Sequence, residues 1–280
     1  MKIGAFMFYT DTSIGVVEAA QALEARGFES IWVPEHTHIP SSRKTPYLYG
    51  GELPDAYRHT LDPYVVLGMI AATTQRIRLG TGISLVVERD PITLAKSVAS
   101  VDQLSGGRME LGIGGGWNRE ELEHHGVPFP RRWKVLRERT EAMRAIWTQE
   151  EASYQGEFVS FEKIWCWPKP VQQPGPRVWI GGDGANTLRR VVRYGDGWLP
   201  TSDKRPSFAD KIAELNALAA AAGRGPLPVS VMGTPGDAAL LEQYARDGVE
   251  RCIFWLPPTG EAKVLARMDE LARLAEPYLS

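Results

Sequence analysis

The chain has 280 residues, of which 43% are hydrophobic and 24% charged, and its formal net charge is −2. This composition is typical of a globular protein, and the near-neutral charge does not favour binding to nucleic acid or to an anionic membrane. Two cysteines make no disulfide framework, no apolar run reaches the roughly 18 residues of a membrane span, and the N-terminus lacks a signal-peptide pattern, so we expect a cytoplasmic protein.

The predicted elements alternate between short apolar runs and amphipathic segments along the whole chain. Apolar runs predict strands at residues 2–8, 29–33, 77–87, 108–114, 177–182, 196–200, 228–233 and 250–256. Helical periodicity predicts helices at residues 16–25, 63–71, 91–104, 133–147, 185–194, 208–218, 237–247 and 260–277. Eight strand–helix units are typical of a single (β/α)8 barrel of the TIM type, here one α/β domain over residues 1–280. A doubly wound sheet fits less well, because six or seven strands usually suffice for it.

Two connections in this barrel are unusually long. One runs over residues 35–61 and is rich in Gly, Pro, Ser and Tyr, and the other covers residues 150–176 and contains Trp165 and Trp167. Long ordered loops in a compact domain are usually functional, although they can also simply cap a barrel. We therefore expect both loops at the C-terminal face, where they would contact the substrate.

The first polar cluster follows the second predicted strand, in the stretch VPEHTHIP. Catalytic residues of (β/α)8 barrels lie at the C-terminal ends of the strands, which is where this stretch falls. His36 and His38 could bind a metal together, but such a site needs further ligands from later strands. The other histidines are His59, His124 and His125, and none follows the fifth to eighth strands, so we expect no metal.

Two other interpretations of this stretch remain. Loop histidines often bond to backbone carbonyl groups, and this is the simpler interpretation for His38. Alternatively, His36 is an acid–base group, because imidazole titrates near neutral pH and the adjacent Glu35 could orient the ring.

Glycines interrupt the chain at the ends of three other predicted strands. Gly82 lies inside the third strand, where it indicates a bulge, a close approach to a ligand, or a simple twist of the strand. The stretch 114–118 joins the fourth strand to a helix through three glycines, and bare amides at a helix start favour an anion. It lacks the GxGxxG spacing and the ribose-binding acid of a Rossmann site. His124 and His125 end that helix, where they complement its dipole before Gly126.

The fifth strand runs into a second glycine-rich turn over residues 181–184, followed by Asn186, Thr187 and Arg190. Backbone amides with a nearby guanidinium group would suit a phosphate monoester. Two such turns in one barrel, together with nine tryptophans that could pack against a planar ring, predict a phosphorylated aromatic cofactor.

The order of these motifs resembles the luciferase-like family of flavin- and deazaflavin-dependent oxidoreductases. The resemblance lies in the stretches MKIGAFMF, ALEARGFESIWVPEHTH, IRLGTGISLVVERDPITLAKSVASVDQLSGGRMELGIGGGWNREELEHHGVPFPRR and WIGGDGANTLRRVVRYGDGWLP, which span residues 2 to about 200. The stretch EHTHIP is most similar to members that use the deazaflavin coenzyme F420.

The resemblance implies roles for specific residues. Glu35 and His36 match an acid–histidine pair beside the reacting carbon of the cofactor, and Gly82–Ile83 matches a non-proline cis peptide behind its ring. Two groups match the turns beside the cofactor and at its ribityl-phosphate tail, namely Gly115, Gly116, Trp117 and Asn118, and Gly181, Gly182, Asp183 and Gly184. Deazaflavin-dependent sugar-phosphate dehydrogenases carry a catalytic glutamate where this chain has Trp117, which argues against the same substrate.

The resulting hypothesis is an oxidoreductase that transfers a hydride between coenzyme F420 and an unidentified small organic substrate. His36 would donate or remove the accompanying proton, with Glu35 orienting it. Arg43 and Lys44 could hold the polyglutamate tail of F420, or they are solvated loop charges. The alternatives are an FMN-dependent monooxygenase supplied by a separate reductase, a non-catalytic flavin or deazaflavin carrier, and a metal hydrolase. The resemblance also implies a homodimer.

Overall fold

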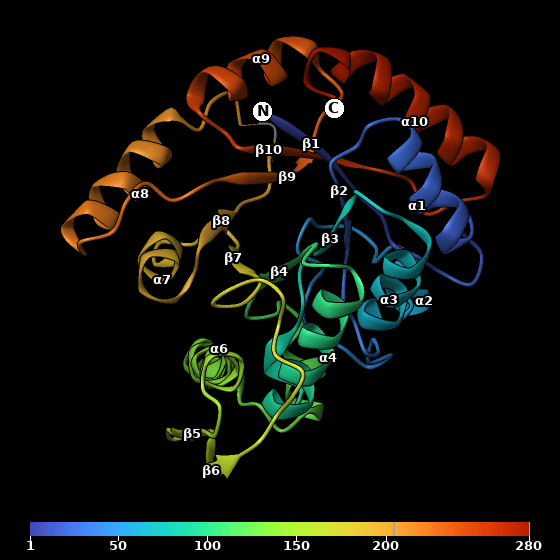
Figure 1. The fold of residues 1–280 in the computed structure, drawn as a ribbon. Helices are drawn as coiled ribbons and strands as arrows, with labels where there is room; N and C mark the ends of the chain where they lie inside the picture. Colours follow the sequence, from blue (N-terminus) through green and yellow to red (C-terminus); the bar gives the residue numbers. More distant parts are fainter. Residues whose placement is uncertain (204, 280) are drawn as a thin grey trace.

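The computed structural model describes residues 1–203 and 205–279, and Lys204 and Ser280 lie outside the described residues. Within the described residues, eight parallel strands form one sheet in the order β8-β7-β4-β3-β2-β1-β10-β9 (Figure 1). These strands are β1 (Lys2–Phe6), β2 (Ser30–Val33), β3 (Arg78–Thr81), β4 (Met109–Ile113), β7 (Arg177–Gly181), β8 (Gly197–Leu199), β9 (Ser230–Thr234) and β10 (Arg251–Trp255). Parallel bridges from Trp198 to Val229 and from Thr201 to Met232 nearly close the sheet into a barrel. The predicted (β/α)8 barrel is therefore confirmed.

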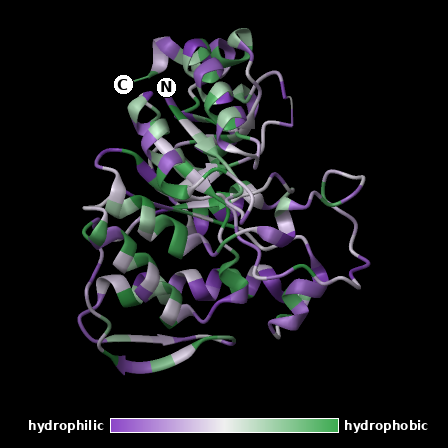
Figure 2. Ribbon diagram, turned by 90° about the vertical axis from the view of Figure 1, so that its right-hand side faces the viewer, coloured by the Kyte–Doolittle hydropathy of each residue, from purple (hydrophilic) through white to green (hydrophobic). Residues whose placement is uncertain are grey.

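Helices follow the strands and cover the outside of the barrel (Figure 1). The long ones are α1 (Val16–Ala25), α3 (Pro63–Thr73), α4 (Pro91–Leu104), α6 (Arg132–Thr148), α7 (Thr187–Tyr194), α8 (Ala209–Ala221), α9 (Ala238–Asp247) and α10 (Glu261–Ala275). Shorter turns are α2 (Ala56–His59), α5 (Arg119–His124), η1 (Val86–Glu88), η2 (Phe129–Arg131) and η3 (Glu276–Tyr278). Hydrophobic segments gather in the strands and helices, whereas the long loops on the right of Figure 2 are mainly polar. No helix among the described residues is long and apolar enough to cross a membrane.

Two predicted segments differ from the structure. The strand expected over residues 77–87 ends at Thr81, where the chain turns through a cis peptide between Gly82 and Ile83 and continues into η1. The loop over residues 150–176 contains an antiparallel hairpin of β5 (Ala152–Gln155) and β6 (Ser160–Ile164). Most hairpin residues are at least partly exposed, so it lacks the continuous apolar run that marks a barrel strand.

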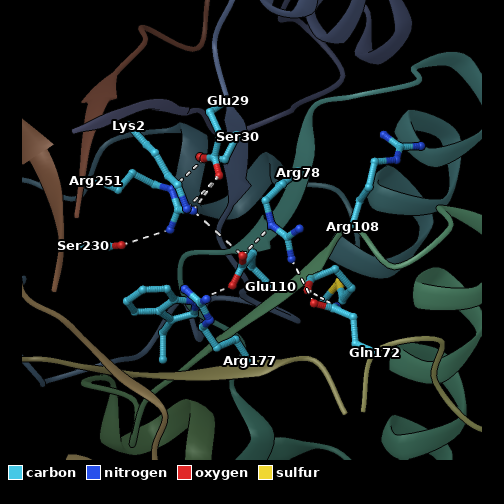
Figure 3. A network of polar contacts seen from close by, with 12 residues as sticks. Lys2, Glu29, Ser30, Arg78, Arg108, Glu110, Gln172, Arg177, Ser230 and Arg251 are labelled. Carbon is cyan, nitrogen blue, oxygen red and sulfur yellow. Dashed lines mark hydrogen bonds and ion pairs between the residues drawn. The ribbon is translucent and has the colours of Figure 1, made fainter. Parts of the chain in front are cut away.

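A network of charged side chains fills the barrel at the N-terminal ends of the strands (Figure 3). The fully buried guanidinium group of Arg251 donates to both carboxylate oxygens of Glu29, at 2.7 and 2.8 Å. Glu110, also buried, accepts from Arg78 Nε at 2.5 Å and from Trp179 Nε1 at 2.6 Å. This network and the buried tryptophans Trp32 and Trp179 fill this end of the barrel, so we look for a ligand site at the C-terminal ends of the strands.

Candidate active site

A cavity of about 670 Å³ opens at the C-terminal ends of the strands. Its walls include ten of the twelve residues that the sequence predicts for the site: Glu35, His36, Gly82, Ile83, Gly115, Gly116, Trp117, Gly181, Gly182 and Asp183. Asn118 lies just outside the wall and is fully buried, and Gly184 is exposed beside it. The topology of the barrel therefore brings residues from four separate strand ends to one cavity.

Ile83 forms part of the cavity floor, directly after the cis peptide that the resemblance implies. A Cβ atom at Gly114 would lie 2.2 Å from Ile83 Cδ1, and one at Gly181 would lie 2.9 Å from Ile83 Cγ2. Both distances are shorter than real carbon contacts, so glycine at these two positions makes room for the Ile83 side chain. The glycines at the ends of β4 and β7 thus have a packing function as well as a place beside the cavity.

His36 is held by a buried carboxylate from another element of the barrel. Its Nδ1 atom lies 2.8 Å from Oε2 and 3.1 Å from Oε1 of Glu121, on α5. A carboxylate only accepts hydrogen bonds, so Nδ1 carries the proton and donates it. Nε2 has no hydrogen-bond partner among the described residues, and the ring lines the cavity. This arrangement leaves Nε2 available for proton exchange with a molecule in the cavity.

The expected contact between Glu35 and His36 is wrong. The Glu35 carboxylate accepts from Ser84 Oγ at 2.7 Å and from the Leu85 N–H at 2.6 Å, and it pairs with Arg89. Successive side chains of an extended segment point to opposite sides, so two adjacent residues are poorly placed to bond to each other. Glu35 instead anchors the segment that follows the cis peptide, and Glu121 orients His36.

The sequence signal for Glu121 was present but ambiguous. Glu120 and Glu121 occupy the first turn of α5, where acidic residues are common because they complement the helix dipole. Only the fold shows that the two have different partners. Glu120 bonds to Thr45 and to the Lys44 N–H in the long loop, whereas Glu121 turns inward to His36.

A further buried carboxyl group near Glu121 is that of Glu88. It is buried, and neither of its oxygens has a hydrogen-bond partner among the described residues. Burial raises the pKa of Glu88 to about 9, and the nearby charges of Glu121 and Glu35 act in the same direction. His125 Nε2 lies 3.7 Å from Glu88 Oε2, and burial lowers the pKa of that histidine. Both shifts favour the neutral forms, so at neutral pH this contact joins two uncharged groups.

The remaining histidines near the site bond to one another. Thr37 Oγ1 lies 2.9 Å from His38 Nδ1 and 2.8 Å from His125 Nε2, and His38 Nε2 lies 2.9 Å from His124 Nδ1. His38 was expected to bond to backbone carbonyls, but its partners are these side chains. The part of the chain that the structure describes contains no group of three or more His, Cys, Asp or Glu side chains suited to a metal ion.

Aromatic side chains form the wall around His36. The ring centre of Tyr57 lies 5.1 Å from the centre of the imidazole ring, and the ring centre of Trp117 lies 6.0 Å from it. Leu48, Tyr49 and Tyr57, which also line the cavity, come from the long loop over residues 35–61. The loop over residues 150–176 supplies none of the residues found in the cavity wall, because its hairpin packs beside α6 on the outside.

The turn over residues 181–184 offers hydrogen-bond donors at the edge of the cavity. Gly182 has a φ of +96°, and its carbonyl accepts from Trp198 Nε1 at 2.8 Å. The N–H groups of Gly184, Ala185 and Asn186, just before α7, have no acceptor among the described residues. These amides lie next to Gly182 and Asp183, which line the cavity together with Arg132. Amides and a guanidinium group at this edge of the cavity would fit a phosphate group.

Arg43 and Lys44 lie elsewhere in the long loop. The guanidinium group of Arg43 lies 5.7 Å from the Trp117 ring centre and bonds to the Thr45 carbonyl. Neither residue is among those that line the cavity.

Comparison with known proteins identifies relatives over almost the whole chain. The model of the luciferase-like monooxygenase family matches residues 9–236. An uncharacterized protein of Mycobacterium tuberculosis, Rv0953c, is 44% identical over 277 residues, which cover 97% of this chain and 98% of the relative.

Two solved structures show the same fold with different cofactors in their descriptions. An F420-dependent secondary alcohol dehydrogenase in complex with an F420-acetone adduct has a TM-score of 0.76 and 16% identity, covering 100% of this chain and 99% of that one. The second structure is the oxygenating constituent of the 3,6-diketocamphane monooxygenase of Pseudomonas putida, in complex with FMN. It has a TM-score of 0.67 and 17% identity, and the match covers 84% of this chain and 67% of that one. At these identities the likeness shows the fold alone.

Proposed function

Since the chain belongs to the luciferase-like monooxygenase family, we propose that it is an oxidoreductase that transfers a hydride between coenzyme F420 and a small organic substrate. The observation that carries the proposal is the His36–Glu121 pair, whose imidazole lines an apolar cavity at the C-terminal ends of the strands. Reducing a carbonyl, or oxidising an alcohol, requires a proton to move together with the hydride, and this ring can exchange one.

The residues present fit a flat ring with a phosphorylated side chain. Ile83 and the aromatic residues provide apolar surface for a ring, and the cavity of about 670 Å³ is within the range of small-molecule sites. The bare amides before α7 provide donors for a phosphate.

The cofactor, when bound, supplies or accepts the hydride at the reactive carbon of its ring. His36 Nε2 donates a proton to the substrate oxygen, or removes one from it, according to the direction of the reaction. Glu121 holds the ring in one tautomer and stabilises its protonated form by a charge-assisted hydrogen bond. Tyr57, Trp117 and their neighbours exclude water around the reacting atoms, which strengthens these electrostatic interactions.

The deazaflavin is favoured over FMN by the need for this proton donor. A monooxygenase needs space for oxygen at a reduced flavin, whereas a dehydrogenase or ketoreductase needs an acid–base group beside its substrate oxygen. The similar fold of an F420-dependent secondary alcohol dehydrogenase also favours the deazaflavin, whereas the similar fold of an FMN-bound monooxygenase favours FMN. A separate reductase would supply the reduced cofactor, and we expect a homodimer.

Titration with each cofactor tests the proposal. Quenching of tryptophan fluorescence by F420 and by FMN should give a dissociation constant in the micromolar range for F420 and at least about 1.4 kcal/mol weaker binding, a factor of ten, for FMN. Tight binding of FMN with none of F420 would instead support the monooxygenase. Binding of either cofactor without turnover of any alcohol, aldehyde or ketone in a substrate panel would support the carrier.

A further inference from the structure

A second, smaller hollow lies beside the cavity, between α6 and α7. It measures about 260 Å³, and five of the eight residues that line it are cationic: Lys134, Arg137, Arg189, Arg190 and Arg193. The residues that line it include no aspartate or glutamate. We name this hollow the arginine groove.

Three of its positive charges are not neutralised. Lys134 pairs with Glu157, and Arg137 lies 3.6 Å from Glu138 and 3.7 Å from Glu141. Arg189, Arg190 and Arg193 have no carboxylate within 4.0 Å among the described residues. Burial lowers the pKa of Arg132, and the charge of Arg190 lowers it further. Like charges gathered without counter-ions raise the free energy of the folded chain and attract an anion.

A buried hydroxyl group provides a second, independent sign of a ligand. Tyr194 lines the groove and is only 7% exposed, and its hydroxyl has no hydrogen-bond partner among the described residues. Burial raises the pKa of this hydroxyl to about 12, so it keeps its proton and offers a donor. Asn186, at the start of α7, lines the groove as well. The groove is thus rich in donors and positive charge.

The groove continues from the proposed phosphate site. Trp133 lines both the cavity and the groove, and the guanidinium group of Arg190 stacks over its ring at 3.8 Å. Along α7, Asn186 and Arg193 are seven residues apart, which corresponds to roughly 10 Å at about 1.5 Å per residue. A ligand whose phosphate binds before α7 could therefore extend several further charged groups over this helix.

We propose that the arginine groove binds a chain of carboxylates that continues beyond the phosphate of the cofactor, as in the oligoglutamate tail of F420. This inference rests on the proposed function. FMN ends at its phosphate and would leave the groove unused. The sequence suggested Arg43 and Lys44 as the residues that hold this tail. Neither residue lines the groove, and we assign the tail to the groove instead.

The test compares two deazaflavin probes, one with five or six glutamates and one that ends at the phospholactyl group. Binding is measured by fluorescence quenching at low and at high salt. The native chain should bind the oligoglutamate probe about tenfold more tightly at low salt, since several exposed ion pairs act together. High salt should remove this advantage.

The variant Arg189→Gln/Arg193→Gln should lose the advantage and bind the shorter probe as the native chain does. Both side chains are exposed, so the fold should be retained, which circular dichroism checks. The matched control is Arg246→Gln/Arg267→Gln, on α9 and α10 away from α6 and α7 (Figure 1), which removes the same charge and should keep the advantage.

The outcomes separate the groove from the proposed function. If the native chain binds both probes equally, or if the Arg189→Gln/Arg193→Gln variant keeps the tighter binding of the oligoglutamate probe, the groove does not bind the tail. Neither result would contradict the proposed deazaflavin site. Binding of neither probe, with tight binding of FMN, would overturn both. An equal loss in the control variant would show that net charge, and not the groove, causes the effect.

Discussion

Glu121 lies 85 residues from His36 in the sequence, yet its Oε2 atom is 2.8 Å from the Nδ1 atom of that histidine. The histidine follows β2 and the glutamate lies on α5, which follows β4. Segments that follow two strands on either side of β3 therefore build one acid–base unit. The pair is almost completely buried, with side-chain exposures of 7% and 1%. The imidazole is thus fixed on one side and free on the side of the cavity.

Replacing His36 should abolish most of the turnover and leave cofactor binding intact. We expect His36→Ala to lower the rate of hydride transfer by about 10²–10⁴-fold, the usual contribution of a general acid or base. The measurement follows the absorbance of the deazaflavin with a panel of alcohols and ketones, beside an F420 titration. His59→Ala is the matched control, because that histidine pairs with Asp11 instead. Equal rates for His36→Ala and the native chain would remove His36 from the mechanism.

Glu121→Gln should lower the rate of the reaction and leave cofactor binding intact. An amide can present either its oxygen or its NH2 group to Nδ1, so it no longer fixes the tautomer of His36 as the carboxylate does. We expect the rate of hydride transfer to fall by at least about tenfold, measured beside an F420 titration and a circular dichroism spectrum. Glu120→Gln is the matched control, because Glu120 bonds to Thr45 and not to His36. A native rate in Glu121→Gln would remove this residue from the mechanism.

A methyl group at Gly114 should weaken cofactor binding. The new Cβ atom would lie 2.2 Å from Ile83 Cδ1, so the side chain on the cavity floor must move toward the cavity. We expect Gly114→Ala to raise the dissociation constant of F420 at least about tenfold, which is equivalent to about 1.4 kcal/mol of binding free energy. Gly225→Ala is the control, since its Cβ would meet nothing within 4 Å. Native affinity in Gly114→Ala would show that Ile83 does not shape the ring site.

The buried Glu88 predicts a pH-dependent stability. Its pKa in the folded chain is about 9, above the ordinary value of 4.5, so the folded state binds one more proton than the unfolded state between these values. This group therefore lowers the free energy of unfolding as pH rises through that window, by at most about 1.4 kcal/mol per unit. Below about pH 4.5 both states are protonated, and the effect ends.

Glu88→Gln removes this titration and keeps the shape of the side chain. Urea unfolding of both chains at several pH values should show the variant gaining stability relative to the native chain as pH rises from 5 to about 9. Other titrating groups, including His125, are present in both chains and cancel in the difference. A difference that stays constant over this range would mean that Glu88 is ionised in the folded chain.

The charged network at the closed end of the barrel should be costly to break. Arg251→Met leaves Glu29 and Glu110 without their shared partner, and loss of one member of a buried ion pair costs about 3–5 kcal/mol. Arg246→Met, on the exposed face of α9, should change the free energy of unfolding by less than about 0.5 kcal/mol. If urea denaturation gave similar free energies of unfolding for the two variants, the charged network would not stabilise the barrel.

The barrel could be predicted because its strands are buried on both faces and read as continuous apolar runs. The predicted helices over residues 63–71 and 91–104 each follow an Asp-Pro pair, which is typical of a helix start. In the structure the carboxylates of Asp62 and Asp90 accept N–H groups of the first turn. The hairpin over Ala152–Ile164 escaped prediction, because its half-exposed strands carry no such run.

The sequence could predict where on the barrel the candidate site lies, but not which side chains contact one another there. Strand ends of a barrel converge, so His36 and the glycine turns could be assigned to one face from their order alone. Which carboxylate faces His36 depends on side-chain directions: Glu35 turns to Ser84 and Leu85, and Glu121 takes the place expected for it. The arginine groove lies between two helices, and sequence periodicity does not show which charged faces meet there.

The decisive measurement is a crystal structure of the chain with F420 and a bound substrate. We expect the deazaflavin ring in the cavity against Ile83, its reactive carbon and the substrate facing His36 Nε2, and its phosphate at the amides before α7. A ring bound outside this cavity, or an imidazole of His36 turned away from the ring toward solvent, would contradict the proposal.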